Sequence, residues 1–387
     1  MKAVRTFMQR YNFASPAIML AIFAGLLLSA CSEQQTAPTF HAQDNPTRLS
    51  DWGMLETSTD ELVISEGVTP YDLATPLFSD YALKLRTVWT PAGAPVLYNS
   101  DSVFEFPVGT VITKTFYYPT TGDEWTGDVS ISRERSINNN AMALDHLRLI
   151  ETRVLVHRET GWEALPYIWN DEQTDAVLKR TGDVIPMTLH RDDGRTEQFG
   201  YLVPNVNQCA GCHATDATAR TIEPIGPKAR HLNKPSSFAP AFNQLDHWLA
   251  KGLLTGEIAQ PAPRNAEWTD ESEPVEVRAR AYLDANCSHC HNPVGPADTS
   301  GLNLEPDATG PALGICKTPI AAGIGTGDRI FDIVPGDPDA SITIFRMETD
   351  NPGAMMPELG RAVTHEEGVA LVSEWIARMD GDCSQKG

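Results

Sequence analysis

Two short motifs of identical spacing carry the most reactive side chains of this sequence. Residues 209–213 read Cys-Ala-Gly-Cys-His, and residues 287–291 read Cys-Ser-His-Cys-His. At this spacing two thiols can bond to the vinyl groups of one haem, and the histidine that follows can ligate its iron. The predicted cofactors are two haems c, held by Cys209, Cys212, His213, Cys287, Cys290 and His291.

Other chemistries also use two cysteines at this spacing. Such a pair can form a disulfide, bind zinc or act as a thioredoxin-like dithiol. None of these explains why a histidine occupies the fifth position of both motifs, so we favour haem attachment. The rest of the sequence has no spacing typical of a catalytic triad, a phosphate loop or a metal site, and we predict no catalytic residue.

The first 30 residues are typical of an export signal, because basic residues precede an apolar run over residues 18–28. Residues 28–31, Leu-Ser-Ala-Cys, resemble the bacterial lipobox, which implies cleavage before Cys31 and lipidation of its sulfur. An ordinary signal peptide beside an unrelated cysteine is the alternative. We expect a lipid-anchored protein in the envelope of a Gram-negative bacterium. In the lipoprotein resemblance, Ser32 after the cysteine implies sorting to the outer membrane, facing the periplasm.

The chain is strongly acidic. It has 30 basic and 51 acidic residues, a formal net charge of −21, which becomes −24 once a leader with three positive side chains is removed. This charge disfavours nucleic acid as a partner and favours a redox protein with a basic docking patch.

The pattern along the chain predicts several segments. Residues 108–118 and 147–157 alternate in polarity and are rich in β-branched or aromatic residues, as strands are. In the second of these, Glu151 and Arg153 share a face, and we expect an ordinary surface or cross-strand pair. The segments are a signal peptide (1–30), a flexible tether (31–60), a mainly β domain (61–205), a first haem unit (206–268) and a second haem domain (269–387).

The second haem domain has clear helix signals. A helix is predicted from Pro274 into the second motif, and a later one after a capping box at residues 364–367. Such flanking helices resemble those of a class I cytochrome c. Between them Met356 precedes Pro357 and resembles the sixth iron ligand of that class, with Met355 as the alternative; both could instead be core methionines.

The sixth ligand of the first haem is less defined. No methionine lies between His213 and the second unit, and His289 is expected to face outward. His231 is the first candidate for this sixth ligand. The alternatives are His247, Met187, His190 or an iron with no sixth ligand.

The cysteine count suggests a disulfide. Of seven cysteines, Cys31 and the four motif cysteines leave Cys316 and Cys383. Two remaining cysteines in one domain of an exported protein favour a disulfide bond between them, with two free thiols as the alternative.

These features together resemble a family of bacterial diheme c-type cytochromes, often lipoproteins. The resemblance covers most of residues 60–380. Besides the two motifs and Met356-Pro357, it is carried by residues 106–111, 150–153, 226–230 and 334–338. It implies a multidomain fold, with a mainly β N-terminal domain followed by two small all-α cytochrome c-like haem domains.

Electron transfer is the leading functional expectation. The alternative is a haem enzyme, peroxidase-like or another oxidoreductase, in which the second haem feeds an open first haem. The β domain could also serve as a binding module beside either role.

Overall fold

The computed structural model describes residues 37–383, except Thr59, Asp123, residues 132–136, Asn139 and Ala321. A six-stranded antiparallel sheet, the main sheet, organises this part of the chain. In spatial order its strands are β12 (Ala176–Leu178), β11 (Gly161–Trp169), β10 (Leu147–Arg158), β6 (Val111–Pro119), β4 (Leu83–Trp89) and β3 (Thr69–Tyr71). The long strands are rich in β-branched and aromatic residues, which pack well on a pleated surface.

Three smaller sheets complete the β structure. One contains β1 (Leu55–Thr57), β2 (Glu61–Ile64), β9 (Ala141–Ala143) and β8 (Ile137–Asn138). A second contains β14 (Thr196–Val203), β13 (Asp183–His190) and β7 (Asp128–Ser130), and β15 (Leu254–Thr255) pairs in parallel with β5 (Val96–Leu97).

Part of the segment expected to be a tether is folded. Leu49 and Trp52 of the 3₁₀ helix η1 (Leu49–Trp52) are buried in a core with strands of the main sheet. The indole N–H of Trp52 donates to the hydroxyl of Tyr167 at 2.8 Å. Residues 49–57 therefore belong to the β region.

Six α-helices and two further 3₁₀ helices lie in the described part of the chain. The α-helices are α2 (Val206–His213), α3 (Ala229–Leu232), α4 (Gln244–Ala250), α5 (Val275–Asn286), α6 (Ile342–Glu348) and α7 (Glu366–Ala377), and the 3₁₀ helices are η2 (Asp298–Ser300) and η3 (Gly323–Thr326). Within the described ranges, none is long and apolar enough to cross a bilayer.

The predicted fold, a β domain followed by two small all-α haem domains, is wrong. The chain is β-rich, and two such domains are not seen among the described residues. Helices α2, α3 and α4 are too short to bury an independent core. Leu232 and Trp248 pack instead in one core with Ile112 of the main sheet, and β15 extends the β structure.

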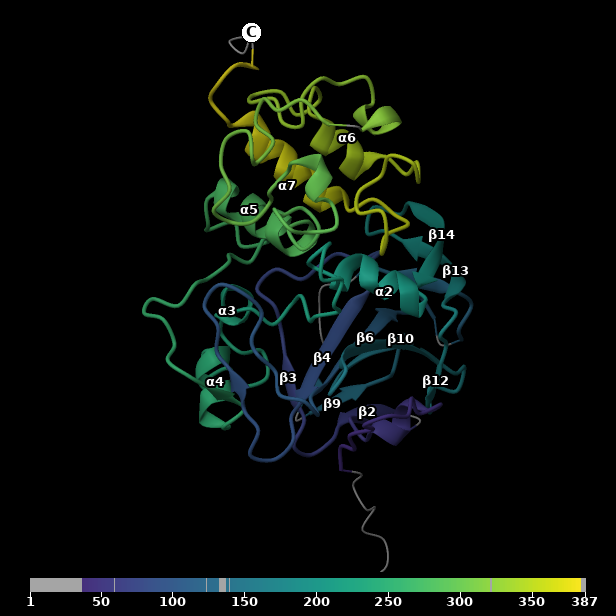
Figure 1. The fold of residues 1–387 in the computed structure, drawn as a ribbon. Helices are drawn as coiled ribbons and strands as arrows, with labels where there is room; N and C mark the ends of the chain where they lie inside the picture. Colours follow the sequence, from purple (N-terminus) through teal and green to yellow (C-terminus); the bar gives the residue numbers. More distant parts are fainter. Residues whose placement is uncertain are drawn as a thin grey trace, which may run out of the picture. The chain divides into compact units, whose positions relative to one another are not determined.

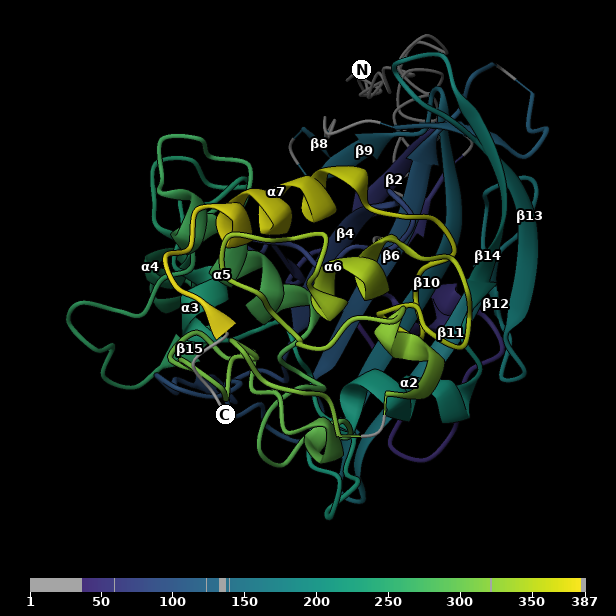
Figure 2. The same ribbon diagram turned by 90° about the horizontal axis from the view of Figure 1, so that it is seen from above.

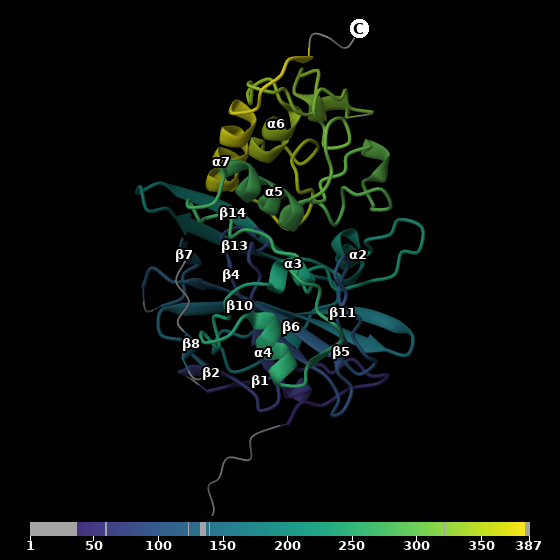
Figure 3. The same cartoon turned by 90° about the vertical axis from the view of Figure 1, so that its left-hand side faces the viewer.

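Helices α5, α6 and α7 are grouped together, with α2 between this group and the strands (Figures 1 and 3). Seen from above, the strands of the main sheet pass behind the group (Figure 2). Leu283, Ile344 and Val372 share its core, and long irregular segments connect its helices. Cys316 and Cys383 form a disulfide bond within this region, with an S–S distance of 2.08 Å.

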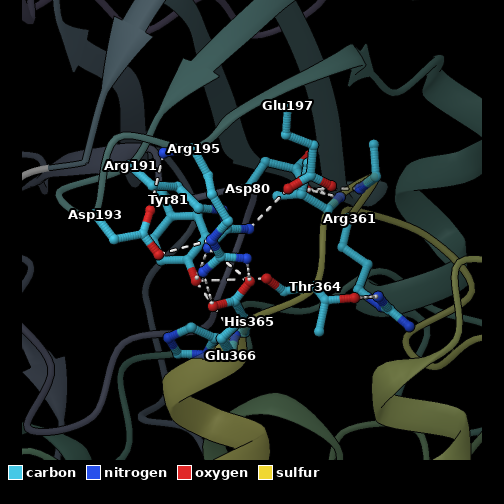
Figure 4. A network of polar contacts seen from close by, with 12 residues as sticks. Asp80, Tyr81, Arg191, Asp193, Arg195, Glu197, Arg361, Thr364, His365 and Glu366 are labelled. Carbon is cyan, nitrogen blue, oxygen red and sulfur yellow. Dashed lines mark hydrogen bonds and ion pairs between the residues drawn. The ribbon is translucent and has the colours of Figure 1, made fainter.

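A polar network joins the β region to the start of α7 (Figure 4). The buried carboxylate of Asp80 accepts the backbone N–H groups of residues 362 and 363, at 2.6 and 3.0 Å. At the end of the β13–β14 hairpin, Arg195 donates two hydrogen bonds to Glu366, at 2.9 and 2.7 Å. The helical group is thus held against the strands by buried and exposed polar contacts.

Candidate functional site

The first motif lies on α2, directly after β14. Asn205 caps this helix, because its side-chain oxygen accepts the N–H groups of Asn207 and Gln208 while Gln208 accepts the N–H of Asn205. Cys209 and Cys212 are three residues apart on the helix and therefore share a face. The cap fixes the first residue of α2 and therefore the positions of the two cysteines and the histidine on this helix.

The imidazole of His213 is held in one tautomer. Its Nδ1 lies 2.7 Å from the carbonyl oxygen of Glu223, which can only accept, so Nδ1 carries the hydrogen. Burial, with the nearby charge of Lys114, lowers the pKa of His213 to about 4. The neutral ring therefore presents the Nε2 lone pair, the arrangement that a metal-ligating histidine requires.

In the second motif, His291 is held in the same tautomer by a different hydrogen-bond partner. Helix α5 runs directly into Cys287, and Nδ1 of His291 lies 3.1 Å from the Ser300 hydroxyl oxygen. That hydroxyl donates its hydrogen to the carbonyl of Ala297, at 2.7 Å, so it accepts from Nδ1–H of His291. Burial lowers the pKa of His291 to about 4, which again leaves a neutral ring with a free Nε2.

The four motif cysteines are free thiols. Burial raises the pKa of all four, to about 12 for Cys287 and Cys290. Reactive dithiols of the thioredoxin kind depend instead on a lowered pKa. In the described part of the chain no group of three or more His, Cys, Asp or Glu side chains could hold a metal, whereas structural zinc takes four ligands. A haem iron needs at most two protein ligands, so thioether attachment is compatible with this geometry.

The two motifs are in direct contact although 78 residues separate their first cysteines. The Cys290 thiol lies 3.6 Å from the carbonyl oxygen of Gly211, between the two cysteines of the first motif. Nearby, Ala217 donates its N–H to the carbonyl of Val294 at 2.7 Å. A methyl group added to Gly211 would meet Leu359 at 3.0 Å, so the chain is tightly packed here. Groups bonded to the two pairs of thiols would be neighbours.

A cavity opens beside Cys209, Cys212 and His213, and we call it the motif cavity. It is partly open to solvent, and apolar residues make up much of its wall. Ile112 and Leu155 of the main sheet contribute to that wall. A concave, mostly apolar wall with a few polar side chains is typical of a cofactor site.

The sheet side of the motif cavity carries a row of three cations. Arg86 on β4 lies directly opposite Lys114 on β6, and Lys114 lies directly opposite Arg153 on β10. All three line the motif cavity. Like charges directly opposite one another destabilise a sheet, so this cationic row favours an anionic occupant.

The charges around the row are only partly compensated. Arg153 donates two hydrogen bonds to Glu151, whose carboxylate is fully buried and also accepts the Tyr201 hydroxyl at 2.8 Å. The expectation that Glu151 and Arg153 form an ordinary surface pair is therefore wrong. Within the described residues Lys114 makes no hydrogen bond or ion pair, and burial with repulsion from Arg153 and Arg86 lowers its pKa to about 7.

The candidates for a sixth ligand at the first motif differ in whether they line the motif cavity. His231 is buried in the cavity wall, but Asn265 contacts its Nδ1 at 3.3 Å and Asp284 lies 3.6 Å from its Nε2. His190 contacts Asp128 at 2.8 Å. The motif cavity is not lined by His190, His247 or Met187.

Met355 and Met356 are the candidate sixth ligands at the second motif. Met355 and Met356 are half-buried, and the backbone N–H of Met356 donates to the carbonyl of Arg346 at 2.8 Å. The adjoining Pro357 and Leu359 line the motif cavity. The Met-Pro loop therefore lies where the two motifs meet.

The motif cavity contains a histidine that the sequence did not suggest. His289, between the two cysteines of the second motif, lines this cavity and is only 7% exposed. The expectation that it faces outward is wrong, because the turn after α5 directs residues 288 and 289 toward the first motif.

A buried ion pair joins the two motif regions. The guanidinium of Arg230 donates to both oxygens of Asp284 on α5, at 2.7 and 2.9 Å. The hydroxyl of Ser288 and the amide of Asn265 also donate to this carboxylate. Although burial opposes it, these contacts hold the pKa of Asp284 well below its usual range.

No family model, curated protein or solved structure matches this chain. The resemblance to diheme c-type cytochromes is therefore corrected, since the described chain is mostly β, lacks two all-α haem units and contains no cluster of metal ligands. Cys31, the predicted lipidation site, lies outside the described residues.

Proposed function

We propose that the chain carries two covalently attached haems c and transfers electrons between them and a redox partner. The observation that carries this proposal is the contact between the two Cys-x-x-Cys-His motifs, with Cys290 against the backbone of Gly211. When bound, each haem supplies an iron that exchanges one electron between its ferrous and ferric states. Electron transfer slows steeply with distance, so adjacent attachment sites favour exchange.

The residues around the first motif fit one haem. Cys209 and Cys212 would form the thioether bonds, and His213 would bind the iron through Nε2. The apolar wall of the motif cavity suits a porphyrin, and the cationic row suits its two carboxylates. Together these groups accept the apolar surface and the negative charge of the cofactor.

At the second motif, Cys287, Cys290 and His291 would take the same roles. Met356 is the proposed sixth ligand, and a thioether opposite histidine raises the potential of a haem. Met356→Ala should abolish the absorption band of methionine ligation and lower one midpoint potential. The adjacent Met355→Ala is the matched control, and loss of the band only in that variant would move the ligand to Met355.

Redox titration tests the electron-transfer role. The wild type is compared with two variants that each keep one motif, Cys209→Ala/Cys212→Ala and Cys287→Ala/Cys290→Ala. Because neighbouring irons influence each other's charge, the two wild-type potentials should differ from those of the single-haem variants. Potentials identical to those of the isolated sites would place the haems too far apart for the proposed exchange.

An envelope location is also part of the proposal. Lipidation of Cys31 would anchor the protein, and its acidic surface would attract a partner with a basic patch. Cys31→Ser should release the protein from membranes, and added salt should slow reduction by the partner.

A further inference from the structure

His289 stands in an unusual environment for a histidine. Its side chain lies in the wall of the motif cavity, where His213 also lies, and it is more than nine-tenths buried. Within the described part of the chain its imidazole makes no hydrogen bond or ring contact. The ring nitrogens of His289 are not among the fully buried polar atoms that lack a partner, so they reach the open space of the cavity and can bind a ligand there.

The neighbouring histidine of the same wall is already engaged. His231 lies among Asn265, Asp284 and Arg230, which form a closed set of hydrogen bonds and ion pairs. Taking His231 away from this set would leave the amide of Asn265 with one contact fewer. His289 has no such competing contact.

We propose that His289 supplies the second axial ligand to the iron of the haem held by Cys209, Cys212 and His213, an inference that rests on the proposed function. The first haem is then coordinated by two histidines that come from two different motifs. This assignment gives the first site a sixth ligand from the chain and a role to a buried side chain that makes no hydrogen bond among the described residues.

The proposal also gives the two haems a covalent connection. His289 is the residue directly before Cys290, which would bind the second haem. A single peptide unit would therefore join the iron ligand of one haem to the thioether of the other. The contact of Cys290 with Gly211 places the same segment against the first motif.

The test begins with haem content and wild-type spectra. Mass spectrometry of the full mature chain under denaturing conditions must first find two haems, and fewer than two would refute the proposed function itself. Low-temperature EPR and near-infrared magnetic circular dichroism of the ferric protein then report the axial ligands. We expect one low-spin haem with two histidines, and this signal should be missing from Cys209→Ala/Cys212→Ala. A high-spin first haem, or one with an amine ligand, would overturn the inference and leave the proposed function standing.

Variants identify the histidine. In His289→Ala the low-spin signal of the first haem should be lost and a high-spin signal should appear, while the haem count stays at two. Added imidazole should restore the low-spin signal. His231→Ala, at another histidine that lines the cavity, should keep it. Loss of the signal in this control but not in His289→Ala would assign the ligand to His231. If His289→Ala does not accumulate, a signal retained in His231→Ala leaves His289 as the remaining histidine of the cavity wall besides His213.

Discussion

The regions around the two motifs are built in different ways. The first motif sits on a short capped helix that has no core of its own and packs on the main sheet, so distant strands supply the cations of its cavity. The second motif follows a twelve-residue helix and belongs to a region with its own core and a disulfide. The environment of the first site is therefore set by tertiary contacts, and that of the second largely by its own segment.

The largest effect is expected where the two regions meet. Asp284→Ala leaves the mostly buried guanidinium of Arg230 without its carboxylate, and breaking a buried pair costs about 3–5 kcal/mol. Chemical denaturation should show this loss and a separation of the two regions into distinct transitions. The double variant Arg230→Ala/Asp284→Ala should lose less than the sum of the single variants. If the double variant loses as much stability as the two single variants together, the pair does not couple the regions.

Removal of the disulfide should affect the second region alone. Cys316 and Cys383 close a loop of 67 residues, which stabilises the fold by about 4 kcal/mol in the chain-entropy model. The variant with serine at both positions should show faster hydrogen exchange in α5–α7, while β6 and β10 stay protected. Equal exchange increases in the main sheet would show that the regions fold as one.

Asp80 should make the junction with α7 dependent on pH. Burial raises its pKa to about 6, against the opposing hydrogen bonds from residues 363 and 362. With a raised pKa, the contribution of Asp80 to stability is fully present below about pH 4 and is lost as the pH rises through 6, by about 3 kcal/mol in total. Asp80→Asn keeps an oxygen that can accept both N–H groups and should remove this dependence. A constant stability difference between wild type and variant across pH 4–7 contradicts the assignment.

The smallest effect is expected at the exposed end of the same junction. Arg195 and Glu366 are both substantially exposed, and pairs of this kind contribute less than about 1 kcal/mol. Arg195→Ala should therefore barely change the melting temperature. Arg378→Ala, which removes an exposed pair with Glu374 at the C-terminal end of α7, is the matched control. A loss far above that of the control would show that the network acts as a unit.

The sequence predicted local features better than their assembly. The strands around residues 111–118 and 147–157 and the helix before Cys287 follow from alternation and helix signals, which act locally. The capping box predicted over residues 364–367 does not form: the residue before α7 is His365, whose side chain makes no capping hydrogen bond, and Glu367 accepts from Tyr81. A contact with the β region therefore takes the place of the local hydrogen bonds that the sequence pattern predicts.

The cationic row and the position of His289 could not be predicted because both depend on which strands and motifs become neighbours. The sequence contained one sign of the cationic row. Lys114 shares a strand face with Ile112 and Phe116, where an apolar residue is expected. A cation at such a position indicates either a buried pair or a ligand site.

The central claim is tested most directly by the mass of the mature chain isolated from cells that attach haem. We predict the mass of the polypeptide plus two haems, retained under denaturing conditions, and plus one haem in each of the variants Cys209→Ala/Cys212→Ala and Cys287→Ala/Cys290→Ala. A polypeptide without haem, or one whose motif cysteines hold zinc or form disulfides, would contradict the account.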